Sequence, residues 1–192
     1  MGFLGNIAGM LQQYASGGQP GGNVEDHFDQ VGQAVPSSSI ADGLSAAFRS
    51  DKTPPFAQMA GQLFDRSNGQ QQASVLNELI ATAGPSLLSS LSGGGGGLGS
   101  ILGGSGLGAL LGGAGASGLT AMLSGRQPIT AEQASQVPPE VVTQLAAHAE
   151  KQDPSIVDRM SSIYAEHPGL IKTLGSAALT IALAKIAERH GA

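Results

Sequence analysis

The sequence predicts an all-α protein, and three observations lead to this fold class. Apolar residues recur at intervals of three and four along several segments, which is the spacing of one helix face. Prolines, glycines and capping residues separate these segments. No stretch shows the sustained apolar and polar alternation, bounded by hairpin turns, that is typical of β-strands. We therefore expect many short helices in two helical regions, residues 23–92 and 126–192, joined by a Gly/Leu-rich tract at residues 93–125.

Residues 1–16 are expected to form an amphipathic helix without any charged residue. Its apolar face would carry the association residues Phe3, Leu4, Ile7, Leu11 and Tyr14. Glycine-rich residues 17–22 follow as a flexible hinge. Such a helix could dock on its own domain, on a second copy or on a membrane surface. Docking on protein is favoured, because a helix that lies on a membrane surface normally carries Lys or Arg on its polar face.

Residues 23–92 are expected to form a series of short helices, each announced by a residue that suits a helix start. Asn23, Ser38 and Thr53 can each cap a helix. Pro54 suits the first turn of the third of these helices. A fourth helix would contain Val75, Leu76, Leu79 and Ile80. Gly84 and Pro85 are expected to end this helix and to begin another one.

The Gly/Leu-rich tract, residues 93–125, holds half of the chain's 30 glycines, interleaved with leucines. The leucines distinguish it from a flexible linker, and each glycine costs about 1 kcal/mol relative to alanine inside a helix. Packing must therefore compensate if the tract is helical. Glycines at four-residue intervals would lie on one helix face and allow close approach of another backbone. The candidate association glycines are Gly99, Gly103, Gly104, Gly108 and Gly112.

Residues 126–192 contain further start signals for helices. Thr130 and Gln133 form a capping-box pattern. Pro139, Pro154 and Pro168 suit the first turns of the three helices that follow. The helix after Pro168 is apolar around much of its circumference and has basic residues near its end. We expect it to run to about residue 190 as one central core helix.

Composition and motifs argue against several function classes. The formal net charge of −5, without clustered Lys or Arg, argues against a nucleic-acid partner. The absence of Cys excludes disulfides, cysteine-ligated metals and thiol nucleophiles. A helix would place Glu25 and Asp29 on one face and His27 nearly opposite, which is a poor arrangement for a metal. We assign no catalytic, cofactor-binding or metal-binding residue, expect no cofactor, and do not expect an enzyme.

Two glycine-containing patterns bear on enzymatic chemistry. Residues 113–118 fit the pattern G-x-G-x-x-G, but no predicted strand precedes them. The sequence contains no G-x-S-x-G nucleophile motif. Neither observation supports a phosphate-binding loop or a hydrolase.

Cytoplasmic localisation is expected, because the first basic residue is Arg49 and a secretory signal needs a basic region before its apolar stretch. Membrane association is the alternative, with residues 98–123 inserted as a glycine-faced helix. The tract is long enough for this. No aromatic belt or basic cluster flanks it, however, so membrane insertion is the less favoured alternative.

The glycine tract, the run Pro128-Ile129-Thr130-Ala131-Glu132-Gln133 and the later Leu145-Ala146-Ala147 together resemble the YidB-like family of small bacterial proteins of unknown function. The resemblance covers about residues 98–160, and the chain departs from it at Asp153-Pro154. It implies an all-helical bacterial protein and offers no catalytic residue.

Taken with the composition, these features predict a non-enzymatic protein that associates with copies of itself or with a helical partner. The apolar first helix and the Gly/Leu-rich tract would supply the contacts. A protein that inserts the tract into a membrane is the alternative function.

Overall fold

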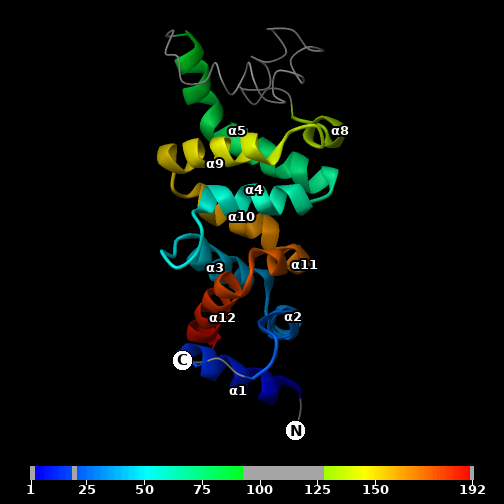
Figure 1. The fold of residues 1–192 in the computed structure, drawn as a ribbon, viewed down its shortest axis with the longest axis vertical. Helices are drawn as coiled ribbons and strands as arrows, with labels where there is room; N and C mark the ends of the chain where they lie inside the picture. The colour runs from blue at the N-terminus through cyan, green and yellow to red at the C-terminus, as the bar shows by residue number, and fades with distance from the viewer. Residues whose placement is uncertain (1–2, 19–20, 93–127, 191–192) are drawn as a thin grey trace. The chain divides into compact units, whose positions relative to one another are not determined.

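The structure is a computed structural model that describes residues 3–18, 21–92 and 128–190. Within these residues it contains ten α-helices, one 3-10 helix and no strand, which confirms the all-α prediction (Figure 1). The Gly/Leu-rich tract lies outside the described residues. The chain forms two compact units, one of Met1–Pro55 with Val157–Ala192 and one of Phe56–Ile156.

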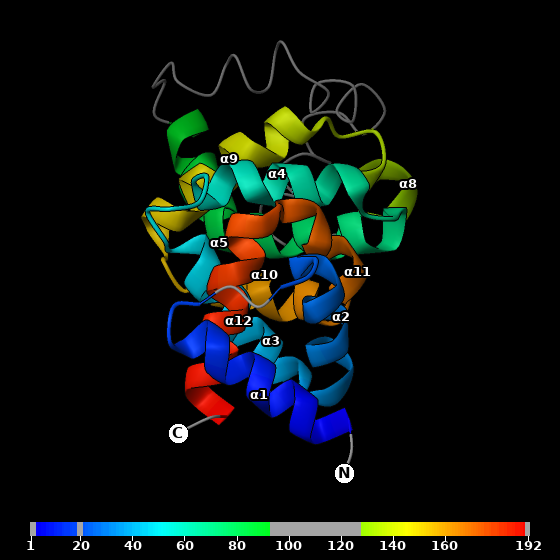
Figure 2. The same cartoon turned by 60° about the horizontal axis from the view of Figure 1, so that its bottom comes forward.

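The first unit is built around its last helix. Its elements are α1 (Phe3–Ala15), α2 (Val24–Ala34), α3 (Ser37–Phe48), α10 (Ile156–Ala165), α11 (Pro168–Ile171), η1 (Lys172–Leu174) and α12 (Ser176–His190). Helix α12 contacts α1, α2 and α3, as Figures 1 and 2 show from two directions. Leu179, Ala182 and Leu183 of α12 are fully buried. Helix α12 is therefore the core helix of this unit.

The segment after Pro168 is not the single long helix that the sequence predicts. Helix α11 ends at Ile171 and η1 at Leu174, and α12 begins only at Ser176, after Gly175. Gly175 has φ of +89° and ψ of 165°, a conformation that residues with a Cβ rarely adopt. The prediction was wrong because apolar periodicity continues across this glycine while the backbone does not stay helical.

Helices α3 and α12 approach each other closely at Gly43. A Cβ atom at this position would lie 2.7 Å from the carbonyl oxygen of Ala182 and 3.0 Å from Cγ1 of Ile186. Gly43 is itself buried. The absence of a side chain at Gly43 therefore sets the distance between the two helices.

The second unit contains α4 (Phe56–Arg66), α5 (Gly69–Ser92), α8 (Ala131–Ala134) and α9 (Pro139–Gln152). Helix α9 packs against α4 and α5, and α8 packs against α5. At Gly61 of α4, a Cβ atom would collide with Oγ1 of Thr143 in α9. The fully buried side chains of this unit include Met59, Leu63, Val75, Leu76, Leu79 and Val142.

Helix α5 continues through Gly84 and Pro85, so the prediction of a helix end at these residues was wrong. Figure 1 shows α5 changing direction toward its carboxyl-terminal end. Proline lacks an amide hydrogen and bends a helix when neighbouring contacts hold both halves. Here the hydroxyl of Ser86 donates a hydrogen bond of 2.7 Å to the carbonyl oxygen of Ala83, one turn earlier.

The predicted helix starts are only partly correct. Asn23 does precede α2, although its side chain makes no capping hydrogen bond. Pro36 rather than Ser38 precedes α3, because Ser37 already begins the helix. Thr53 does not cap α4, which begins at Phe56. Its hydroxyl instead donates to the carbonyl oxygen of Ala47, in the last turn of α3, at 2.6 Å.

The capping box at Thr130 and Gln133 is confirmed, and it belongs to a firmly held turn. Just before it, the amide of Ile129 donates to Oδ1 of Asn77 at 2.7 Å. Nδ2 of Asn77 donates in return to the carbonyl oxygen of Ile129 at 3.2 Å. Asn77 therefore anchors Ile129 to α5, and α5 and α8, the described elements on either side of the Gly/Leu-rich tract in the sequence, pack against each other.

Candidate functional site

The apolar face of α1 is covered within the same chain. Ile7, Leu11 and Tyr14 are only 4%, 5% and 4% exposed. Phe3 and Leu4 belong to the same helix. Helix α1 packs on α12 and α2, and Figure 2 shows it beside both. Of the three docking options that the sequence leaves open for this helix, the structure shows docking on its own unit.

One polar contact joins α1 to α2 at the edge of this apolar interface. The hydroxyl of Tyr14 lies 3.0 Å from Nδ1 of His27, and the two rings meet edge to face at 6.0 Å between centroids. Burial raises the pKa of the Tyr14 phenol, so this side chain is neutral at physiological pH. His27, which the sequence suggested only as a weak metal candidate, is thus a packing partner of α1.

The segment of residues 17–22, between α1 and α2, has a glycine with positive φ at each end. Gly17 has φ of +76°, its amide donates to Tyr14, and the amide of Gly18 donates to the carbonyl oxygen of Gln13 at 2.9 Å. This is the Schellman pattern of a helix end. Gly22 has φ of +134°, and a Cβ there would lie 2.9 Å from Nε2 of His27. We call this segment the hinge.

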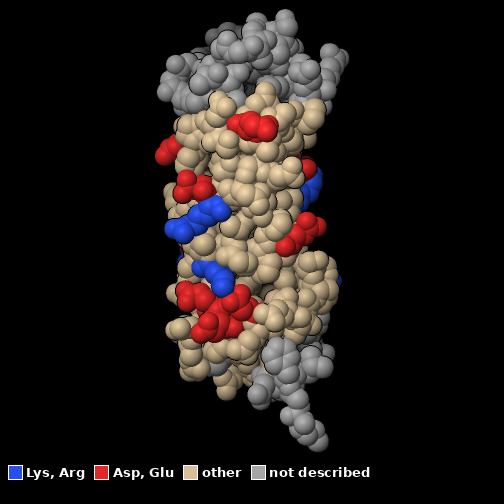
Figure 3. All heavy atoms as spheres, turned by 90° about the vertical axis from the view of Figure 1, so that its right-hand side faces the viewer, with Lys and Arg blue, Asp and Glu red and all other residues tan. Residues whose placement is uncertain are grey.

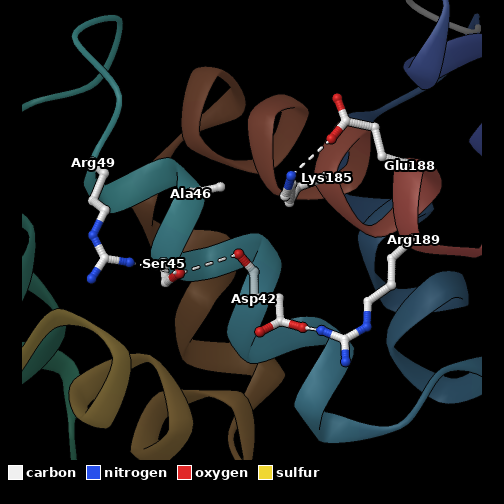
Figure 4. Close-up of a pocket in the computed structure, with 7 residues that line it drawn as sticks. All are labelled: Asp42, Ser45, Ala46, Arg49, Lys185, Glu188 and Arg189. Carbon is white, nitrogen blue, oxygen red and sulfur yellow. Dashed lines mark hydrogen bonds and ion pairs between the residues drawn. The ribbon is translucent and has the colours of Figure 1, made fainter. Parts of the chain in front are cut away.

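A groove of about 740 Å³ lies between α3 and α12 in the first unit. Figure 4 shows the seven residues that line it, Asp42, Ser45, Ala46, Arg49, Lys185, Glu188 and Arg189. Arg189 pairs with Asp42, and Nζ of Lys185 lies 2.9 Å from Oε2 of Glu188. The cations of the groove are therefore engaged with carboxylates, which leaves little attraction for an anionic ligand.

Arg49 of the same groove points to a carboxylate on α10. Its guanidinium donates to both carboxylate oxygens of Asp158, at 2.6 and 2.8 Å. This hydrogen bonding lowers the pKa of Asp158. Both side chains are about half exposed, so solvent screens the pair and its contribution to stability is small. Sequence reasoning missed this pair because its partners are 109 residues apart.

A second groove, of about 510 Å³, lies between α4 and α9 in the other unit. It is lined by Gln58, Gly61, Gln62, Asp65, Pro139, Glu140 and Thr143. The hydroxyl of Thr143 donates to the carbonyl oxygen of Pro139 at 3.0 Å. The groove therefore offers amide and carboxylate groups, and its hydroxyl is already committed to the backbone.

Ser86 and His148 form a hydrogen bond at 3.1 Å between Oγ and Nε2. A nucleophilic serine must donate its proton to the imidazole. The Ser86 hydroxyl also lies 2.7 Å from the carbonyl oxygen of Ala83, and the tautomer of His148 decides which side chain donates in the Ser86–His148 pair. The contact joins α5 to α9 close to Pro85.

The surface features bear on other partner classes. Figure 3 shows, on one face, acidic and basic side chains in small separate groups on a mostly uncharged surface. No three His, Asp or Glu side chains of residues 3–18, 21–92 and 128–190 are grouped to hold a metal ion. Among these same residues, no helix combines the length and hydrophobicity needed to cross a bilayer.

Comparisons with known proteins add no relative. No family model matches the chain, and neither the curated proteins nor the solved structures contain a match. The resemblance of residues 98–160 to the YidB-like family stays a prediction. The best supported candidate site is therefore α1 with its docking surface on α12 and α2 and the hinge that tethers it.

Proposed function

We propose that this protein is a non-enzymatic, self-associating helical protein in which α1 is exchanged between copies. One observation carries the proposal: α1 docks through a small apolar face on α12 and α2, and a glycine-rich hinge separates it from the rest of its unit. An exchanged α1 would make the same contacts on the partner's α12 as it makes on its own. Such exchange of an identical element is an accessible route to a dimer.

Energetics explain why such association would depend on concentration. Burial of a large apolar side chain such as Ile7 or Leu11 contributes about 1.5 to 3 kcal/mol, and this gain is the same in the closed and the exchanged form. The short tether between α1 and α2 gives α1 an effective concentration of about the millimolar range at its own docking surface. Closed monomers therefore dominate in dilute solution, and exchanged assemblies grow as the protein concentration rises.

The Gly/Leu-rich tract is proposed as a second association surface. The candidate glycines Gly99, Gly103, Gly104, Gly108 and Gly112 lie outside the described residues, so the support for them is the sequence pattern. No charged residue occurs from Leu79 to Gly125. This apolar stretch suits contact with another protein surface and, as the alternative function, insertion into a membrane.

The first test uses a buried and an exposed position of α1. Leu11→Asp is expected to undock α1 and to lower the mass of the assembly, measured by light scattering over a concentration series, because it places a charge in an apolar interface. Gln12→Asp adds the same charge at an exposed position and is the matched control. Assembly that is unchanged in Leu11→Asp would show that α1 is only an intramolecular core helix.

A second test separates association with protein from membrane insertion. We expect the full-length protein to be released into the supernatant by a carbonate wash at high pH, because helices that pack only on protein leave the membrane fraction under these conditions. Inserted segments stay in the pellet because the bilayer satisfies their apolar surface. Retention in the pellet, together with protease protection of residues 98–123, would favour the membrane alternative.

A further inference from the structure

We infer that Asn68 is a site of spontaneous deamidation and that the capping box at the start of α5 guards it. Asn68 is exposed, and among the asparagines of the chain only Asn68 precedes a glycine. An Asn–Gly pair deamidates most readily, because glycine turns freely and has no side chain to hinder attack on the asparagine. The extent of modification at Asn68 therefore reports how often this helix end opens.

Reciprocal hydrogen bonds hold Asn68 in the folded chain. Its Oδ1 accepts a hydrogen bond from the amide of Gln71 at 3.0 Å, and its own amide donates to Oε1 of Gln71 at 2.9 Å. Its carbonyl oxygen accepts a hydrogen bond from the amide of Gln72 at 2.9 Å. The first two bonds are the capping box of α5, and all three together engage the side chain, the amide and the carbonyl group of Asn68.

Deamidation needs a geometry that the closed capping box excludes. The amide nitrogen of Gly69 loses its proton to hydroxide and attacks Cγ of Asn68. The new N–Cγ bond closes a succinimide ring, the Cγ–Nδ2 bond breaks, and ammonia leaves after it takes up a proton from water. Water then opens the ring, at Cγ to give aspartate or at the main-chain carbonyl carbon to give isoaspartate. Ring closure turns Asn68 away from Gln71 and Gln72, so the box must open first.

The two products affect α5 in opposite ways. Aspartate keeps an acceptor for the amide of Gln71 and places a negative charge at the helix amino terminus, where it is favourable. Isoaspartate lengthens the backbone by a methylene group and shortens the side chain, so it cannot restore the box. Gly69 packs closely on α8, where a Cβ would lie 3.0 Å from the carbonyl oxygen of Ala131, so the longer backbone disturbs this contact as well. Formation of isoaspartate therefore keeps the helix end open.

The test measures deamidation of the full-length chain at mildly alkaline pH, by peptide mapping with mass spectrometry. Gln71→Ala removes one of the two bonds of the box and is expected to accelerate deamidation at Asn68 about three- to tenfold. Gln70→Ala makes the same change at an exposed position of the same turn and is the matched control, with an expected change of less than about twofold. In urea, where the box is absent, Asn68 is expected to react at the same rate in all three chains.

Equal rates in the folded wild-type and Gln71→Ala chains would overturn the inference, because the box would then not guard Asn68. Deamidation of Asn23 in urea as fast as that of Asn68 would also overturn it, since the branched side chain of Val24 hinders the attack at Asn23. Hydrogen exchange at the Ile129 amide, which α5 holds in the same unit, is expected to be unchanged in Gln71→Ala. Acceleration there by the same factor as deamidation would show that the whole unit opens, and it would contradict opening of the helix end alone.

Discussion

Gly43→Ala is expected to destabilise the first unit by about 1 to 3 kcal/mol, the usual range for overpacking a buried contact. The added methyl group would lie 2.7 Å from the carbonyl oxygen of Ala182, which belongs to a helix backbone and cannot rotate away. Helices α3 and α12 must therefore separate. Urea unfolding followed by circular dichroism measures the loss in the free energy of unfolding.

The same substitution in the neighbouring helix α2 provides the control. A Cβ at Gly32 would meet Pro168 and Ile40 at 3.7 and 3.8 Å, which are ordinary contact distances. Gly32→Ala is expected to stabilise the unit by up to about 1 kcal/mol, because alanine is the better helix former. Equal shifts in the two variants would show that helix propensity, and not the close approach of α3 and α12, governs both positions.

Asn77→Ala is expected to destabilise the second unit by about 2 to 4 kcal/mol. The substitution removes the partner of both the amide and the carbonyl group of Ile129, and each unsatisfied buried group costs about 1 to 3 kcal/mol. Asn77→Asp keeps an acceptor for the amide but loses the donor to the carbonyl oxygen, so an intermediate loss is expected. Hydrogen exchange at the Ile129 amide should accelerate in Asn77→Ala and change little in Asn77→Asp, which keeps the acceptor.

Ser74→Ala serves as the control on the same helix. Its exposed hydroxyl donates only to the carbonyl oxygen of Gln70 within α5, so its loss is expected to change stability by less than about 0.5 kcal/mol. If Asn77→Ala behaves like Ser74→Ala, the two hydrogen bonds between Asn77 and Ile129 do not contribute to the stability of the second unit.

Local sequence signals predicted those features whose partners are close in the chain. The capping box at Thr130 succeeded because its partner Gln133 is three residues away and the geometry follows from a helix start alone. The break at Gly175 and the continuation through Pro85 were both mispredicted. In each case the apolar periodicity is the same whether the backbone stays helical or not, and only packing decides.

The candidate site depended on contacts that no local pattern contains. The face of α1 could be read from the spacing of Ile7, Leu11 and Tyr14. The sequence could not show that α12 covers this face, because the two helices are separated by most of the chain. The pair of Arg49 and Asp158 could not be predicted for the same reason. The turn at Gly17 was indicated only by the glycine-rich composition of its segment.

The first unit is made of two chain segments that a ribosome produces at different times. Its residues up to Pro55 emerge early, whereas Ala182, which Gly43 must contact, emerges only after the whole second unit has been synthesised. The second unit is continuous and can fold while translation continues. Until α12 is synthesised, helices α1 to α3 lack their packing partner, and Phe28, Leu44 and other core side chains are exposed to solvent. A chain that terminates early, after Ile156, would therefore have a folded second unit joined to an amino-terminal segment with exposed apolar side chains. Such a segment would be prone to aggregate and would need chaperones.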